Sequence, residues 1–187
     1  VVACDQFTSQ PEYWEKVKNL VDTNPSTLNM IFPEVYLEDG DIQDKILKIN
    51  SSMDKYLKDN ILTPKSPGFI LVDRSTPQTT SRKGLLVAVD LENYDYSKGA
   101  QSLIRATEGT VLDRLPPRVK IRQNAPLEIP HILVLIDDEE KSIIEPLAEK
   151  TDELEKLYDF EFMMGGGNIK GYMVNKSEDI EGILNGI

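Results

Sequence analysis

The spacing of apolar residues changes after Leu57, and this change limits the folds that the chain can adopt. Before it, apolar side chains recur every three or four residues, which is typical of amphipathic helices. Helices are therefore expected from the turn after Ser9 to about Val21 and over residues 41–60, with a strand at residues 27–32 between them. Residues 9–12 match a capping box. After Leu57 the apolar residues form short β-rich runs, so the two periods together predict an α+β or mixed α/β protein.

The β-rich runs predict a mixed, mainly antiparallel sheet with helices packed on it. Residues 69–72 and 85–91 flank a polar turn at residues 75–83, which is typical of a hairpin. Residues 132–136 are wholly apolar and favour a central strand, and further strands are expected at residues 157–162 and 170–174. Helices are expected at residues 141–155 and 177–184. No repeat or low-complexity linker divides the chain, so we expect one compact domain over residues 1–187.

The composition argues against several classes of function. The net charge of −11 disfavours nucleic-acid binding, which depends on neutralising phosphates, and no helix-turn-helix pattern is visible. The apolar runs are too short to cross a bilayer and no signal peptide is visible, so no membrane association is expected. The single cysteine, Cys4, fits a reducing cytoplasm, where we expect the protein to be located. The sequence contains no cluster of cysteine or histidine residues, so no metal site is expected.

A basic segment, residues 98–122, stands out against this acidic background. It holds six cations and two anions, a local charge of +4. Guanidinium groups match the geometry of carboxylate and phosphate, so the segment predicts a site for a small anionic or phosphorylated ligand. Arg105 could instead pair with Glu108 and serve only to fix the loop. The residues predicted to bind the anion are Arg105, Thr107, Glu108, Arg114, Arg118 and Arg122.

The alternation of Arg118, Lys120 and Arg122 with apolar residues allows two local structures. An extended segment would place all three cations on one side, and a charge-guarded edge strand is the interpretation that we favour. A helix would spread them around its surface. Two weaker catalytic candidates flank the apolar run 132–136. His131 before it could act as an acid or base, and Asp137, with Asp138 next to it, could bind magnesium or act as a general base; a structural role is the alternative for each.

Two further segments carry weaker signals. Residues 137–161 hold eleven acids and three lysines, which indicates a solvated helical face or, alternatively, a docking surface for a basic partner. Residues 165–168, Gly-Gly-Gly-Asn, lack the Lys-Ser/Thr ending of a P-loop and predict a hairpin.

The phrases STLNMIFPEVYLE, DYSKGAQSLIRATEGTVLDRLPPRVKIRQNAPLEIPHILVLIDD and FEFMMGGGNIKGY together resemble an uncharacterised bacterial and archaeal family, domain of unknown function number 1015. Its longer members are labelled ParB-like and carry an Asp-Gly-His/Asn-His segment similar to that of ParB-like free-serine kinases. The resemblance implies a ParB/sulfiredoxin-like phosphotransferase that acts on a small molecule and uses ADP or ATP with Mg²⁺. This sequence lacks the Asp-Gly-His/Asn-His segment. We therefore expect an N-terminal fragment without catalysis or an evident cofactor of its own, or alternatively a small-molecule or protein-binding module.

Overall fold

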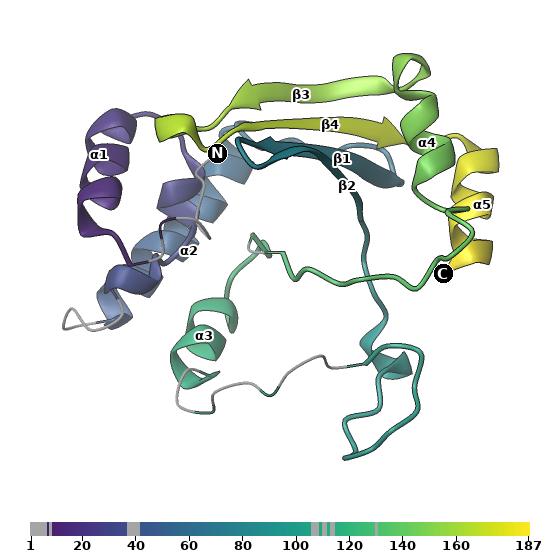
Figure 1. The fold of residues 1–187 in the computed structure, drawn as a ribbon. Helices are drawn as coiled ribbons and strands as arrows, with labels where there is room; N and C mark the ends of the chain where they lie inside the picture. The colour runs from purple at the N-terminus through teal and green to yellow at the C-terminus, as the bar shows by residue number, and fades with distance from the viewer. Residues whose placement is uncertain are drawn as a thin grey trace.

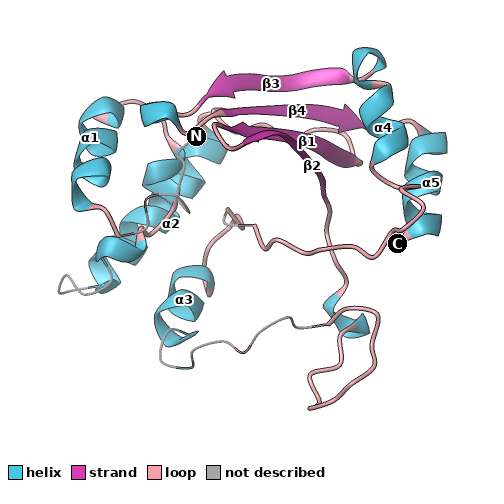
Figure 2. Ribbon diagram, in the orientation of Figure 1, coloured by secondary structure: helices cyan, strands magenta, loops and turns pink. Residues whose placement is uncertain are grey.

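The computed structural model describes residues 7, 9–36, 42–105, 109, 112, 115–129 and 131–187 (Figures 1 and 2). Its helices are α1 (Pro11–Val21), α2 (Ile42–Lys58), α3 (Leu115–Arg122), α4 (Glu145–Glu149) and α5 (Ser177–Gly186). Its strands are β1 (Phe69–Thr76), β2 (Thr79–Leu86), β3 (Glu155–Glu161) and β4 (Asn168–Val174). None of the helices described here has the length and apolar character needed to cross a bilayer.

The four strands form one antiparallel sheet in the order β2-β1-β4-β3 within the described residues. The predicted β1–β2 hairpin is confirmed, but its bounds differ from those expected. The strands close between Thr76 and Thr79, so most of residues 75–83 lie in strands, and β2 ends at Leu86. The strands predicted at residues 157–162 and 170–174 are confirmed as β3 and β4, which form a second hairpin. β4 also pairs with β1, so the two hairpins join through the middle of the sheet. This sheet with flanking helices confirms the α+β fold class.

The core on one face of the sheet is built by the C-terminal helices. Leu71 of β1 and Val174 of β4 are completely buried, and they pack with Leu147 of α4 and Ile183 of α5. Figure 1 shows α4 and α5 together at one end of the sheet and α1 and α2 at the other. Apolar burial of this kind is the main stabilising force in a fold, so α4 and α5 hold this end of the sheet together.

Two further clusters hold the N-terminal helices. Met30 packs with Ile49, Met53 and Tyr56 of α2, and the segment after α3 covers this cluster with Leu127 and its neighbours. The second cluster is formed by the buried face of α1, which consists of Tyr13, Trp14 and Val17. The first of these clusters therefore attaches the segment after α3 to α2.

The two helices with the longest apolar period were predicted correctly, but their surroundings were not. α1 and α2 are confirmed with ends within a few residues of those expected. The capping box at residues 9–12 is wrong, because α1 begins at Pro11 and the cap residue Gln10 makes no side-chain hydrogen bond. The strand at residues 27–32 is also wrong, since Thr27–Met30 is a 3₁₀ turn that is capped by Ser26. The Ser26 Oγ accepts a hydrogen bond from the Leu28 N–H at 3.2 Å.

Three predictions in the second half of the chain need correction. Residues 132–136 form no strand, and they run as coil below the sheet (Figure 1). The edge strand favoured for residues 118–122 is wrong, because these residues lie in α3, which takes Pro116 and Pro117 into its first turn, where proline is tolerated. The helix expected at residues 141–155 is much shorter, and consists of α4 followed by the 3₁₀ turn Thr151–Glu153. The terminal helix is confirmed as α5.

A buried ion pair joins α5 to the chain after α4. Asp179, 6% exposed, accepts a hydrogen bond from the Lys150 ammonium, while its second oxygen has no partner. This hydrogen bond raises the pKa of Lys150 above its usual value of 10.5. A raised pKa in the folded state means that the pair contributes its full stability below pH 10.5 and loses it as the pH rises through the folded pKa.

We therefore expect Lys150→Met to lower the free energy of unfolding by about 1–2 kcal/mol at pH 7, since it leaves a buried carboxylate without its cation. Urea unfolding followed by circular dichroism measures this loss. The difference in unfolding free energy between the variant and the parent chain should become smaller as the pH rises above 10.5. Lys176→Met is the control, because Lys176 pairs with Glu153 at 3.8 Å on an exposed surface. Equal losses in the two variants at pH 7 would contradict a special role for the buried pair.

Candidate functional site

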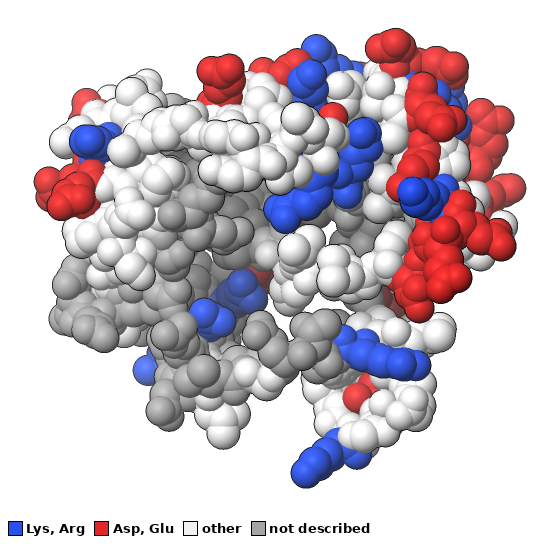
Figure 3. Space-filling view, in the orientation of Figure 1, with Lys and Arg blue, Asp and Glu red and all other residues white. Residues whose placement is uncertain are grey.

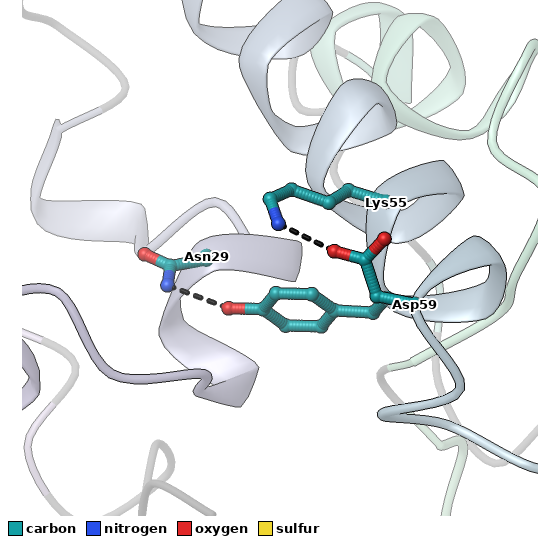
Figure 4. Close-up of polar contacts among 4 residues, drawn as sticks. Asn29, Lys55 and Asp59 are labelled. Atoms are coloured by element: carbon teal, nitrogen blue, oxygen red, sulfur yellow. Dashed lines mark hydrogen bonds and ion pairs between the residues drawn. The ribbon is translucent and has the colours of Figure 1, made fainter.

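Helix α2 is fixed along one side by hydrogen bonds to the 3₁₀ turn before it. The Tyr56 hydroxyl accepts a hydrogen bond from the Ser26 N–H at 3.0 Å. It also accepts one from the Asn29 amide at 2.8 Å, which is drawn in Figure 4. Figure 4 also shows Lys55 and Asp59 pointing toward one another one turn apart, with 2.5 Å between Nζ and Oδ2. The apolar side of α2 is therefore anchored, and its opposite polar side is available to line a site.

Helix α3 lies against α2 because the chain that follows it is anchored there. Leu127 and Ile129 pack on the buried cluster of α2. The Arg122 Nε lies 3.0 Å from a carboxylate oxygen of Glu128, which ties the end of α3 to this anchored segment. The basic helix is thereby held next to the polar side of α2.

A groove of about 520 Å³ lies between these two helices. Such a volume falls within the range of about 300–1,000 Å³ that is usual for small-molecule sites. Lys120 contributes the cation of the groove and Asp54 its carboxylate, and neither makes an ion pair within the described part of the chain. The remaining lining is mostly amide and hydroxyl groups, and the full set is Gln43, Ile46, Leu47, Asn50, Ser51, Asp54, Lys120, Gln123 and Asn124.

Asn50 has a feature that points to a missing donor. Its side-chain oxygen is buried and has no hydrogen-bond partner. A buried acceptor without a partner costs about 1–3 kcal/mol, and a donor that reaches it recovers part of this energy. This oxygen is closed to solvent, however, so Asn50 identifies no ligand group in the groove.

The predicted anion-binding residues fall in different places. The Arg105 Nε donates to the Ser102 carbonyl at 3.1 Å, as a residue that fixes its own loop does. Arg118 and Arg122 lie one turn apart and so share a side of α3, but neither lines the groove. Thr107, Glu108 and Arg114 lie outside the described residues. Anion binding by the arginines stays a prediction.

His131 and Asp137 are both exposed in the coil segment before α4, and neither lines the groove. The next residue, Asp138, has a structural role. Its carboxylate accepts hydrogen bonds of 3.0 Å from the backbone N–H groups of Ser142 and Ile143, and the first of these is the main cause that lowers its pKa. A catalytic role for His131, or for Asp137, also stays a prediction.

A second hollow, of about 320 Å³, lies on the polar half of the sheet. Among its lining residues, Lys170 of β4 lies opposite Asp73 of β1 and opposite Asp159 of β3 in the strand register. The pKa of Asp159 is lowered by a hydrogen bond from Lys156 and, after it, one from Asn168. Since Glu161 adds a third carboxylate, this hollow repels anions, and the groove between α2 and α3 is the better anion site. No cluster of three or more metal-binding side chains occurs among the residues that the structure describes.

A family model described as "Protein of unknown function (DUF1015)" matches residues 1–187. The chain belongs to this family. Comparisons with curated proteins and with solved structures found no match. The family description gives no activity, so the function of this DUF1015 protein has to be argued from its own groove.

Sequence reasoning located half of the groove in this DUF1015 protein. It singled out the basic segment that contains α3, but it assigned the anion to the arginines and left Lys120 without a role of its own. It missed the α2 side altogether. A signal was present, because Gln43, Asn50 and Asp54 follow one another at intervals of seven and four residues and therefore share the polar side of one helix.

Proposed function

We propose that the groove between α2 and α3 binds a small phosphorylated metabolite, and that the chain is the ligand-binding part of a small-molecule phosphotransferase. The observation that carries the proposal is the position of Lys120, a cation without an ion pair within the described residues, in a groove otherwise rich in amides. Lysine binds phosphate as a point charge, and amide N–H groups donate to the remaining phosphate oxygens. The proposal assigns binding, and not the transfer step, to these residues.

The opposite wall supplies groups for the rest of the ligand. The carboxylate of Asp54 and the hydroxyl of Ser51 can accept hydrogen bonds from an amine or from sugar hydroxyls. Asp54 also repels an anionic group from its own wall of the groove, which favours the phosphate at Lys120 on the other wall. A phosphorylated amino acid or sugar combines an anionic end with an amine or hydroxyl end, and therefore matches both walls.

A thermal-shift experiment tests this proposal with phosphoserine, phosphate, pyrophosphate, ADP and ATP, each with and without Mg²⁺, and with serine as the control ligand. A ligand at about ten times its Kd stabilises the folded state by about 1.4 kcal/mol, which raises the Tm by about 4 °C for a chain of this length. If Lys120→Ala weakens binding about tenfold, the same ligand concentration should raise the Tm by only about 1 °C.

Matched variants separate the groove from general charge effects. Lys48→Ala removes an exposed lysine of α2 that does not line the groove and should leave the ligand shift unchanged. Arg118→Ala tests the arginine prediction separately. An equal shift with serine and phosphoserine, no shift with any of the phosphorylated compounds, or a full shift in Lys120→Ala would each rule out the proposed site.

The distribution of acidic residues favours a second function, binding of a basic partner without catalysis. Figure 3 shows acidic side chains gathered over the end of the molecule that carries α4 and α5. Their sources include the first turns of α4 and α5 and the 3₁₀ turn between α4 and β3. A surface of one sign attracts a partner of the opposite sign, and salt weakens such binding. The exposed residues of this surface are Glu145, Glu149, Asp152, Glu153, Glu178 and Glu181.

A further inference from the structure

The apolar run at residues 132–136, Ile-Leu-Val-Leu-Ile, is the most exposed apolar stretch that the structure describes, and is called the ILVLI segment below. Its side chains range from 44% exposed at Ile136 to 82% at Leu135. The segment crosses below the sheet as coil, and it pairs with no strand of the described residues (Figure 1). Five consecutive exposed apolar residues with strand-forming side chains mark a surface for strand pairing with a partner.

The order of residues in the segment favours a second copy of the chain as the partner. Ile-Leu-Val-Leu-Ile reads the same in both directions about Val134. We infer that the ILVLI segment pairs antiparallel with the same segment of a second copy, around a two-fold axis at Val134. In this register Val134 faces its own copy, Ile132 faces Ile136, and Leu133 faces Leu135. Each side chain then has a neighbour of its own type at the close spacing of a β-ladder.

The residues on either side of the segment favour the same register. Two positions outward from the Leu133–Leu135 pair, His131 faces Asp137 of the second copy, and an imidazole N–H can donate to that carboxylate. A parallel pairing in register would instead place each Asp137 beside its own copy, and like charges directly opposite one another are destabilising. The two-fold arrangement therefore forms two complementary pairs, where the parallel one forms a repulsive pair.

A second copy fits the ILVLI segment better than the edges of the described sheet do. The edge strands β2 and β3 carry several charged or polar residues, so neither offers an apolar row of matching length. Residues 137–140 are all acidic and follow the segment directly, which opposes growth of the ladder beyond a pair. An isologous contact of this kind closes as a dimer.

The size of the contact sets its expected strength. Two five-residue segments bury less than the roughly 1,200 Å² typical of stable complexes, so we expect a dimer with a micromolar Kd. Sedimentation equilibrium of the 187-residue chain over a concentration series measures this Kd directly. Because the paired segments are apolar, 0.5 M NaCl should leave the Kd within about threefold, whereas association through the acidic surface would weaken with salt. A chain that stays monomeric up to millimolar concentration overturns the inference.

A first variant tests whether the segment forms the contact. Val134→Lys places two like charges against each other at the two-fold axis and should raise the Kd by at least about tenfold. Since Val134 is 59% exposed, the variant should keep the circular dichroism spectrum and Tm of the parent chain. Leu103→Lys is the control, because Leu103 is 94% exposed and lies outside the segment. A dimer unchanged by Val134→Lys, or weakened equally by both variants, overturns the inference.

A charge exchange tests the register. His131→Asp alone sets two carboxylates opposite each other at both ends of the segment and should raise the Kd about tenfold. Adding Asp137→His again places a histidine across from an aspartate at each end, and should return the Kd to within about threefold of that of the parent chain. Only an antiparallel pairing centred on Val134 brings these two positions together, so a double variant as weak as the single one overturns the proposed pairing.

Discussion

Trp14→Ala is expected to lower the free energy of unfolding by about 4 kcal/mol, within the range found when a buried aromatic side chain is truncated. Trp14 is completely buried and is the largest side chain of the α1 cluster. Its indole N–H donates to the Phe7 carbonyl at 3.0 Å. Its ring lies edge-on to that of Tyr13, with 5.2 Å between the two ring centroids. Truncation removes both contacts and opens a cavity in the buried cluster.

The loss corresponds to a fall in Tm of about 12 °C for a chain of this length, measured by circular dichroism at 222 nm during heating. Leu20→Ala is the matched control, because Leu20 lies in the same helix but is 64% exposed. Its removal should change the unfolding free energy by no more than about 0.5 kcal/mol. A loss below about 1 kcal/mol in Trp14→Ala would show that the cluster contributes little to the fold.

The elements that sequence reasoning located correctly are those with long local periods. α2 presents Ile46, Ile49 and Met53 on one side, and this spacing has no plausible explanation other than a helix. The β1–β2 hairpin also follows from local information, since two β-rich runs flank a polar stretch, although the structure extends both strands into that stretch. In both cases the residues that determine the structure lie within a few positions of one another.

The missed elements depend on contacts that are distant in the sequence. The 3₁₀ turn Thr27–Met30 is held partly by the Tyr56 hydroxyl, which lies 30 positions from Ser26 along the chain. The ILVLI segment has the composition of a strand, but strand composition predicts only the readiness to pair. Whether the segment becomes a strand depends on a partner strand elsewhere in the fold. The described sheet consists of β1, β2, β3 and β4, and the ILVLI segment is not part of it.

The groove shows the same limit for function. Its cation lies in the basic segment that composition singled out, yet the choice of Lys120 over Arg118 and Arg122 depends on which side of α3 meets α2. That orientation is set by packing of the segment after α3, with Leu127 and Ile129 on the buried side of α2. Charge along the sequence therefore indicated one wall of the proposed site, and tertiary packing places Lys120, and not the two arginines, in the groove.

Gly167→Ala is expected to lower the free energy of unfolding by about 3 kcal/mol, through two separate causes. Gly167 has φ +85°, a conformation that side chains with a Cβ adopt only under strain. A Cβ at this position would also lie 2.0 Å from the Ser75 carbonyl oxygen, which belongs to backbone and cannot move aside. The surrounding hairpin is rigid, since the Arg74 guanidinium donates to the Gly166 carbonyl at 2.5 Å and lies 4.4 Å above the Phe162 ring.

Gly165→Ala separates the two causes within the same loop. Gly165 also has a positive φ, +70°, but a Cβ there would meet nothing within 4 Å. Its replacement should therefore cost only the backbone strain, about 1 kcal/mol. Urea unfolding of both variants measures the difference, which is the contribution of the close approach between the β3–β4 hairpin and β1. If the two substitutions cost the same, the hairpin yields to the extra atom, and Ser75 does not fix its position.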